Sequence, residues 1–280
     1  MIISLCNEVV RHLSFEEQCS LAASLRYDGL EVAPFTLSDN PARLTAKERR
    51  YLRQIAEDKG LRITGLHWLL TVPEGLSLTS GDPEVHRRTR DHMLAMVDLC
   101  ADLGGSTLVH GSPGQRQCSS AESASKARDN AVALLIAAAE ASEKAGVVYC
   151  IEPLAPAMTD FINTIAEAVE LVEEISSPGF SAMLDTYAAS HGEDSAPDRI
   201  LDQWLPSGHI RHVHFNDRSK RGPGMGVDLF APSVAVLSRH GYDGIIGVEP
   251  FDYSPEGGAA AAYSVGYIRG LIEMLEQDRG

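Results

Sequence analysis

The chain alternates eight short apolar runs with eight longer segments of helical periodicity, and this alternation restricts the fold more than any other feature. The runs are almost continuously apolar, which is typical of parallel strands covered on both faces. Gly60, Gly104 and Gly146 each stand between a helical segment and the next run, where a helix usually ends. The expected strands are residues 2–6, 29–32, 61–66, 106–109, 147–151, 180–184, 210–215 and 244–248. The expected helices are residues 15–26, 45–59, 82–103, 121–145, 164–175, 197–204, 231–240 and 259–277.

The number and order of these segments predict the architecture. Eight strand–helix units in 280 residues, with no linker between them, favour a single (β/α)8 TIM barrel with parallel strands over residues 1–280. An open doubly wound sheet is the rival fold. Its dinucleotide-binding version lacks support, because no Gly-x-Gly-x-x-Gly motif follows the first strand.

Net charge and cysteine content limit which binding partners and which cellular compartment we expect for this protein. The chain has 39 acidic and 24 basic residues, and a net charge of −15 repels nucleic acid and anionic membranes. Five cysteines with no Cys-x-x-Cys pair indicate neither a disulfide framework nor a thiolate zinc site. No signal-peptide pattern is visible, and the longest apolar run, 131–139, is too short to span a bilayer. We expect a cytoplasmic protein without nucleic-acid or membrane partners, whose last helix could contribute to a homo-oligomer interface.

Each predicted strand is followed by a polar residue that can bind a metal ion or a hydroxyl group. In a (β/α)8 barrel these strand ends meet at one mouth, where active sites are built. The last four strands would each supply one such group at intervals of about one strand–helix unit. The strand-end residues are, in order, Asn7 or Glu8, Glu31, His67, His110, Glu152, Asp185, His214 and Glu249.

The last four strand ends predict a metal site. Three carboxylates and one imidazole in a partly dry mouth repel one another unless a cation is present. Oxygen-rich ligands with one nitrogen suit Mn²⁺, Mg²⁺ or Co²⁺ better than structural zinc, with Mn²⁺ expected first and Zn²⁺ also compatible. Two of the carboxylates, Glu152 and Glu249, lie in matching Ile/Val-Glu-Pro segments. Solvated loop carboxylates are the alternative interpretation of any single one of them.

Several short motifs together resemble a known family. They are Tyr-Asp-Gly-Leu-Glu at 27–31, Ile-Glu-Pro at 151–153, Leu-Asp-Thr at 184–186, His-Val-His-Phe-Asn-Asp at 212–217 and Val-Glu-Pro-Phe at 248–251. By their order and spacing the chain resembles the xylose isomerase-like TIM barrels of the sugar phosphate isomerase/epimerase type, and is most similar to ketose 3-epimerases. The resemblance implies Glu152, Asp185, His214 and Glu249 as ligands of one divalent ion, with Glu152 and Glu249 also forming the acid/base pair.

These residues suggest an isomerase or epimerase that acts on a sugar, a sugar phosphate or a hydroxy-keto acid. One glutamate would remove a proton beside a carbonyl to form a metal-stabilised enediolate, and the other would return it. Elimination from the same intermediate makes a dehydratase or a deglycosidase of a keto-sugar the main alternative. A non-catalytic sugar-binding protein is the alternative from a different class.

An endonuclease IV-like nuclease is a lesser alternative from the same family. Its zinc site needs extra histidines, which His67 and His110 match, but also a His at the position of Ala188 and an Asp-x-His after the seventh strand, which this chain lacks. Ala188 also departs from the ketose 3-epimerases, which place a substrate-binding His there, and His191 is the nearest substitute.

Five further residues are candidates for substrate binding, and each could instead have a purely structural or solvated position. His67 and His110 are expected to face the mouth as neutral donors to substrate hydroxyls, or else to bond a neighbouring strand. Trp68 could stack on a sugar face or plug the barrel top. Arg116 and Lys220 could hold an anionic group, or could belong to solvated loops.

Overall fold

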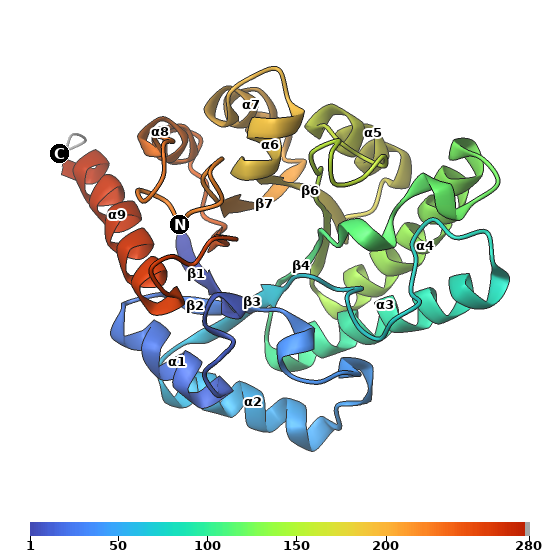
Figure 1. Ribbon diagram of the computed structural model, residues 1–280, viewed down its shortest axis with the longest axis horizontal. Helices are drawn as coiled ribbons and strands as arrows, with labels where there is room; N and C mark the ends of the chain where they lie inside the picture. Colours follow the sequence, from blue (N-terminus) through green and yellow to red (C-terminus); the bar gives the residue numbers. More distant parts are fainter. Residues whose placement is uncertain (278–280) are drawn as a thin grey trace.

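The computed structural model describes residues 1–277 and contains a closed barrel of eight parallel strands in chain order, with β1 paired to β8. Figure 1 shows the strands in the middle of the molecule and the long helices around them. The predicted (β/α)8 barrel is therefore confirmed. The strands are β1 (Ile2–Cys6), β2 (Gly29–Val32), β3 (Arg62–Leu66), β4 (Thr107–His110), β5 (Val148–Ile151), β6 (Phe180–Asp185), β7 (Ile210–Phe215) and β8 (Ile245–Val248).

The outer layer consists of the connecting helices, and Tyr27 helps to close it by donating a hydrogen bond from its hydroxyl to the Ala261 carbonyl. Within the described part of the chain, no helix is both long and apolar enough to cross a membrane. The α-helices are α1 (Phe15–Ser24), α2 (Ala46–Asp58), α3 (Pro83–Leu103), α4 (Ala124–Ala145), α5 (Ile165–Ile175), α6 (Thr186–Gly192), α7 (Pro197–Trp204), α8 (Ala231–Arg239) and α9 (Gly257–Gln277). Short 3-10 helices are η1 (Asn7–Val10), η2 (Pro34–Thr36), η3 (Pro41–Arg43), η4 (Pro113–Gln115), η5 (Cys118–Ser120) and η6 (Leu205–Ser207).

Local capping interactions explain where several helices begin and end. Ser14, Thr45 and Thr164 each form a capping box with a glutamate three residues later, which satisfies free amides in the first turn. Helices α3 and α4 end at Gly104 and Gly146, whose φ angles of 83° and 72° lie in the left-handed region that glycine adopts without strain.

The interior of the barrel differs from the layer between sheet and helices. The buried apolar side chains form one large cluster, and Val109, Cys150 and Met183 form a separate small one. Polar side chains, including Ser4, Glu31 and His212, are also fully buried. The strand register shifts at Glu31 of β2 and at Met183 of β6. The barrel therefore supports a buried polar layer toward the carboxyl ends of its strands.

Candidate metal centre and active site

The four predicted metal ligands lie together at the carboxyl end of the barrel. Glu152 follows β5, Asp185 ends β6, His214 lies in β7 and Glu249 follows β8. One potential ligand atom from each lies within 4.8 Å of the others, and all four side chains are buried. The four predicted side chains thus meet in one place, as the convergence of parallel strand ends in a barrel requires.

The charges of this cluster are not balanced by the four side chains alone. Burial, together with Glu249 and Asp185, raises the pKa of Glu152 well above its usual range. Burial and Glu249 raise the pKa of Asp185 to about 7. Burial alone would lower the pKa of His214, but the carboxylates of Glu31 and Glu249 raise it well above its usual value. The cluster therefore retains protons that a divalent cation would replace.

The donor set fits such a cation. Asp185 Oδ1 accepts a hydrogen bond from the Ala188 amide at 2.6 Å, which leaves Oδ2 buried and without a partner among the described residues. Three carboxylates and one imidazole form the oxygen-rich set that Mn²⁺, Mg²⁺ and Co²⁺ prefer. The residues present are therefore suited to one divalent metal ion.

Glu31 lies beneath this cluster and holds its imidazole. Its Oε1 lies 3.0 Å from Nε2 of His214, whose Nδ1 lies 2.9 Å from Glu249 Oε2. Its Oε2 lies 3.0 Å from Nε2 of His212, although these two atoms are not aligned as a hydrogen bond. Burial would raise the pKa of Glu31, but the two imidazoles lower it well below its usual range. The sequence placed Glu31 at a strand end but indicated no role for it.

Two aromatic residues form one wall of the site. Trp68 donates a hydrogen bond from Nε1 to Glu249 Oε1 at 3.0 Å, and its ring meets Phe251 edge to face with centroids 6.5 Å apart. Its φ of 54° is uncommon for a residue other than glycine. Both rings line a narrow cavity above the cluster. The cavity is lined by His67, Trp68, Val109, Gly111, Glu152, Leu154, Met158, Glu249 and Phe251.

His67 also lines this cavity, and it is paired with the strand-end carboxylate of Glu8. His67 Nε2 lies 2.7 Å from Glu8 Oε2, and both side chains are buried. Burial would lower the pKa of His67, but Glu8 raises it. Of the two residues considered at the end of the first strand, Asn7 instead bonds Gln18 and the Ala33 amide. Glu8 is therefore the one that reaches the site.

The structure places His110 in the barrel wall and not in the cavity. Its Nδ1 lies 2.7 Å from the Tyr149 hydroxyl on the neighbouring strand, the residue is fully buried, and it does not line the cavity. Burial, with a smaller effect of Arg116, lowers the pKa of His110 to about 3. The expected contact with substrate is not supported, and the alternative of a histidine bonded to a neighbouring strand describes its position.

The two cations expected to contact an anion also lie outside the cavity lining. Arg116 is fully buried, and its guanidinium donates to the carbonyls of Glu152 at 2.7 Å and His110 at 3.4 Å. Burial lowers the pKa of Arg116 to about 10. Lys220 is exposed, and its carbonyl accepts from the Phe251 amide. Neither Arg116 nor Lys220 therefore has the position expected of an anion-binding residue, because one serves the main chain and the other faces solvent.

Two further positions near the site are Gly111, which the sequence patterns did not single out, and His191. Gly111, directly after β4, has no room for a side chain, because a Cβ there would lie 1.7 Å from Glu152 Oε2. His191, the nearest substitute for the histidine absent at Ala188, is exposed on α6, where its Nδ1 lies 2.8 Å from the Tyr187 carbonyl.

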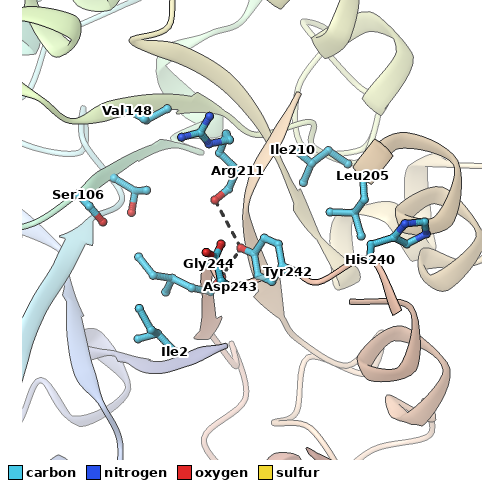
Figure 2. Close-up of a pocket in the computed structure, with 12 residues that line it drawn as sticks. Ile2, Ser106, Val148, Leu205, Ile210, Arg211, His240, Tyr242, Asp243 and Gly244 are labelled. Atoms are coloured by element: carbon cyan, nitrogen blue, oxygen red, sulfur yellow. Dashed lines mark hydrogen bonds between the residues drawn. The ribbon is translucent and has the colours of Figure 1, made fainter. Parts of the chain in front are cut away.

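A larger hollow lies at the opposite end of the barrel, where the strands begin (Figure 2). It is lined by residues such as Ile2, Arg211 and Tyr242, and the Tyr242 hydroxyl donates to the Ile245 carbonyl at 2.8 Å. It contains none of the predicted site residues. The narrow cavity at the carboxyl ends of the strands is therefore the candidate active site.

Comparisons with known proteins agree with this geometry. The family model of the xylose isomerase-like TIM barrel matches residues 19–271, and the chain belongs to this family. A D-psicose 3-epimerase of Enterocloster bolteae is 27% identical over 244 residues, which cover 85% of this chain and 77% of that protein. A protein of Synechocystis named "Probable ketose 3-epimerase" is 24% identical over 258 residues, covering 90% and 84% of the two chains.

A solved structure of D-psicose 3-epimerase with D-tagatose from Clostridium cellulolyticum H10 has the same fold, with a TM-score of 0.83 at 18% identity. The match covers 97% of this chain and 99% of that one. The family resemblance and the barrel are thus confirmed, and the named relatives agree with the predicted enzyme class, an isomerase or epimerase that acts on carbohydrates.

Proposed function

We propose that the protein is a metal-dependent epimerase of a small ketose, in which Glu152 and Glu249 move the proton. The observation that carries this proposal is the convergence of Glu152, Asp185, His214 and Glu249 within 4.8 Å, in a chain whose curated relatives are 3-epimerases. The four side chains would hold one divalent ion, with Mn²⁺ as the first candidate. When bound, such an ion polarises a substrate carbonyl and makes the neighbouring C–H more acidic.

The two glutamates are suited to opposite halves of the proton transfer. A base near the metal takes a proton from the carbon beside the carbonyl, and the electron pair moves onto the carbonyl oxygen to give an enediolate. Glu152 and Glu249 both line the narrow cavity, so each carboxylate could reach a carbon of a substrate held there. Glu249, oriented by Trp68 and His214, would return a proton to the opposite face of the same carbon. Return to the neighbouring carbon, with an exchange of protons between oxygens, would be isomerisation.

The remaining cavity residues would bind substrate. Trp68 and Phe251 offer aromatic surface, and His67 offers a polar edge within the same cavity. Arg116 would position Glu152 through its main-chain carbonyl without touching substrate.

Substitution of each glutamate tests the proposal. We expect Glu152→Gln and Glu249→Gln to lose turnover while circular dichroism remains unchanged, and the wild type to incorporate solvent deuterium into a ketose product. The exposed Glu122→Gln is the matched charge control. Normal epimerisation by both site variants would refute the acid/base assignment. A product lighter by water or an aglycone would instead identify a dehydratase or a deglycosidase, and elemental analysis of the purified protein tests the metal.

A further inference from the structure

We propose that Glu8 and His67 form a subsite for a hydroxyl group at the end of an uncharged ketose, away from the reacting carbons. The same subsite would discriminate against sugars that carry a phosphate or a carboxylate at that end. This inference rests on the proposed function and extends it to the choice of substrate.

The first step is that this pair has buried polar atoms without partners. Glu8 lies in η1 after β1, and His67 directly follows β3. Within the pair, His67 Nε2 and Glu8 Oε2 lie 2.7 Å apart and satisfy each other. The other two polar atoms, Glu8 Oε1 and His67 Nδ1, are buried and have no hydrogen-bond partner within residues 1–277. Native proteins rarely leave such atoms unpaired, so a ligand group is expected to complete them.

The second step is that the pair borders the reaction site. His67 lines the same cavity as Glu152 and Glu249, and its Nε2 lies 3.9 Å from Glu249 Oε1. One oxygen or nitrogen each of Glu8, His67 and Glu249 lies within 4.8 Å of the others. A molecule held beside Glu249 therefore lies close to this pair. A hydroxyl group suits either free atom, because a hydroxyl can donate to Glu8 Oε1, and it can donate to or accept from His67 Nδ1 according to the protonation state of the ring.

The third step concerns charge. Among the residues that line the cavity there is no lysine or arginine. Arg116 is occupied by two main-chain carbonyls, and Lys220 lies in solvent. A phosphate or carboxylate at this end of the substrate would meet the carboxylate of Glu8 with no lysine or arginine in the cavity lining, and a fully ionised phosphate cannot donate to Glu8 Oε1.

Equilibrium binding to the Mn²⁺-loaded wild-type protein tests this subsite. The probes are D-fructose, D-psicose and D-tagatose as free sugars, and the 6-deoxy and 6-phosphate derivatives of the one that binds best. We expect the 6-deoxy sugar to bind about 10- to 100-fold more weakly than the free sugar, as loss of a partner for a buried charged group implies. We expect the 6-phosphate to bind at least about 10-fold more weakly.

Two substitutions of Glu8 separate its hydrogen bond from its charge. Glu8→Ala should reduce the discrimination against the 6-deoxy sugar to within about threefold, because no buried carboxylate then requires a partner. Glu8→Gln should reduce the discrimination against the 6-phosphate, because the charge is lost while an acceptor oxygen remains. Glu122→Gln should leave both ratios as in the wild type. A ratio of dissociation constants within one preparation does not depend on the folded fraction, so a less stable variant still gives a valid result.

The inference is overturned if the wild type binds the 6-phosphate as tightly as the free sugar, or the 6-deoxy sugar within threefold of it. It is also overturned if none of the sugars binds. Failure of the proposed function has a different signature, namely the expected ranking of binding without epimerisation or deuterium incorporation. Conversely, epimerisation with a preference for the 6-phosphate would support the function and reject the subsite.

Discussion

Substitution of Gly111 by alanine would displace the carboxylate of Glu152. The three atoms nearest to the new Cβ would all belong to Glu152, with Oε2 at 1.7 Å, Cδ at 2.9 Å and Oε1 at 3.7 Å. The backbone of Gly111 does not adopt the left-handed conformation, so alanine adds no backbone strain. The substitution is therefore a test of the position of the Glu152 carboxylate.

The size of the effect follows from this geometry. The Glu152 oxygen must withdraw by more than 1 Å before it lies 3.0 Å from the new methyl group. A displacement of about 1 Å of a reacting group lowers a rate by roughly 100-fold, which corresponds to about 2.7 kcal/mol on the activation barrier. The displaced atoms are the end of a flexible side chain, so the free energy of unfolding should change by less than about 1 kcal/mol.

The assay compares Gly111→Ala with Gly114→Ala, a substitution in the same loop whose Cβ would meet no atom within 4 Å. We expect kcat for epimerisation to fall about 100-fold in the first variant and to stay near the wild-type value in the second. Thermal melting checks that both are folded. If Gly111→Ala retains activity within threefold of the wild type while Glu152→Gln is inactive, the position of the Glu152 carboxylate in this structure is not the one used in catalysis.

The remaining predictions concern the metal ligands and their support. The pKa of Asp185 is raised to about 7 in the fold from an ordinary value of 3.8, so the metal-free protein should lose stability as pH rises from about 4 to above 7, as measured by chemical denaturation across that range. Mn²⁺ affinity should increase over the same pH range, because the carboxylates must lose protons to bind the ion, and titration with a chelator checks this. Glu31→Gln removes the carboxylate that holds His214, so Mn²⁺ should bind about 10- to 100-fold more weakly, whereas unchanged affinity would show that Glu31 does not orient the ligand.

The fold and the four central residues followed from the sequence because both depend on simple periodic features. Apolar runs separated by helical segments predict the barrel, and a barrel brings the carboxyl ends of its strands together wherever the intervening helices lie. Helix α6 was missed. Its sequence from Thr186 to Gly192 is short and largely small residues, so it carries no clear amphipathic period. Asp185, which the sequence predicts as a metal ligand, is also the N-cap of this helix. Its interpretation as a ligand left its capping role unconsidered.

The direction of individual side chains was harder to predict, as His110 illustrates. All four residues of β4 are buried, and the polar Thr107 and His110 flank the apolar Leu108 and Val109, so the sequence shows no two-residue period that tells which side chains face the barrel interior. Val109 lines the cavity, whereas His110, the next residue, does not line it and lies within hydrogen-bond distance of the Tyr149 hydroxyl. Arg116 could not be placed for a different reason. Its contacts depend on how the loop after β4 folds, and a cationic residue in a loop is usually solvated.

His214 and His67 each place Nε2 against a carboxylate, but their Nδ1 atoms have different surroundings. This difference separates the predicted metal site from the proposed sugar subsite. His214 places Nε2 against Glu31, and its Nδ1 meets Glu249, a predicted metal ligand. His67 places Nε2 against Glu8, but its Nδ1 meets no protein group in the described part of the chain. A carboxylate behind each ring fixes the ring's orientation. Changes at Glu31 should therefore act mainly on metal affinity and changes at Glu8 mainly on the choice of sugar, because each carboxylate supports a different ring.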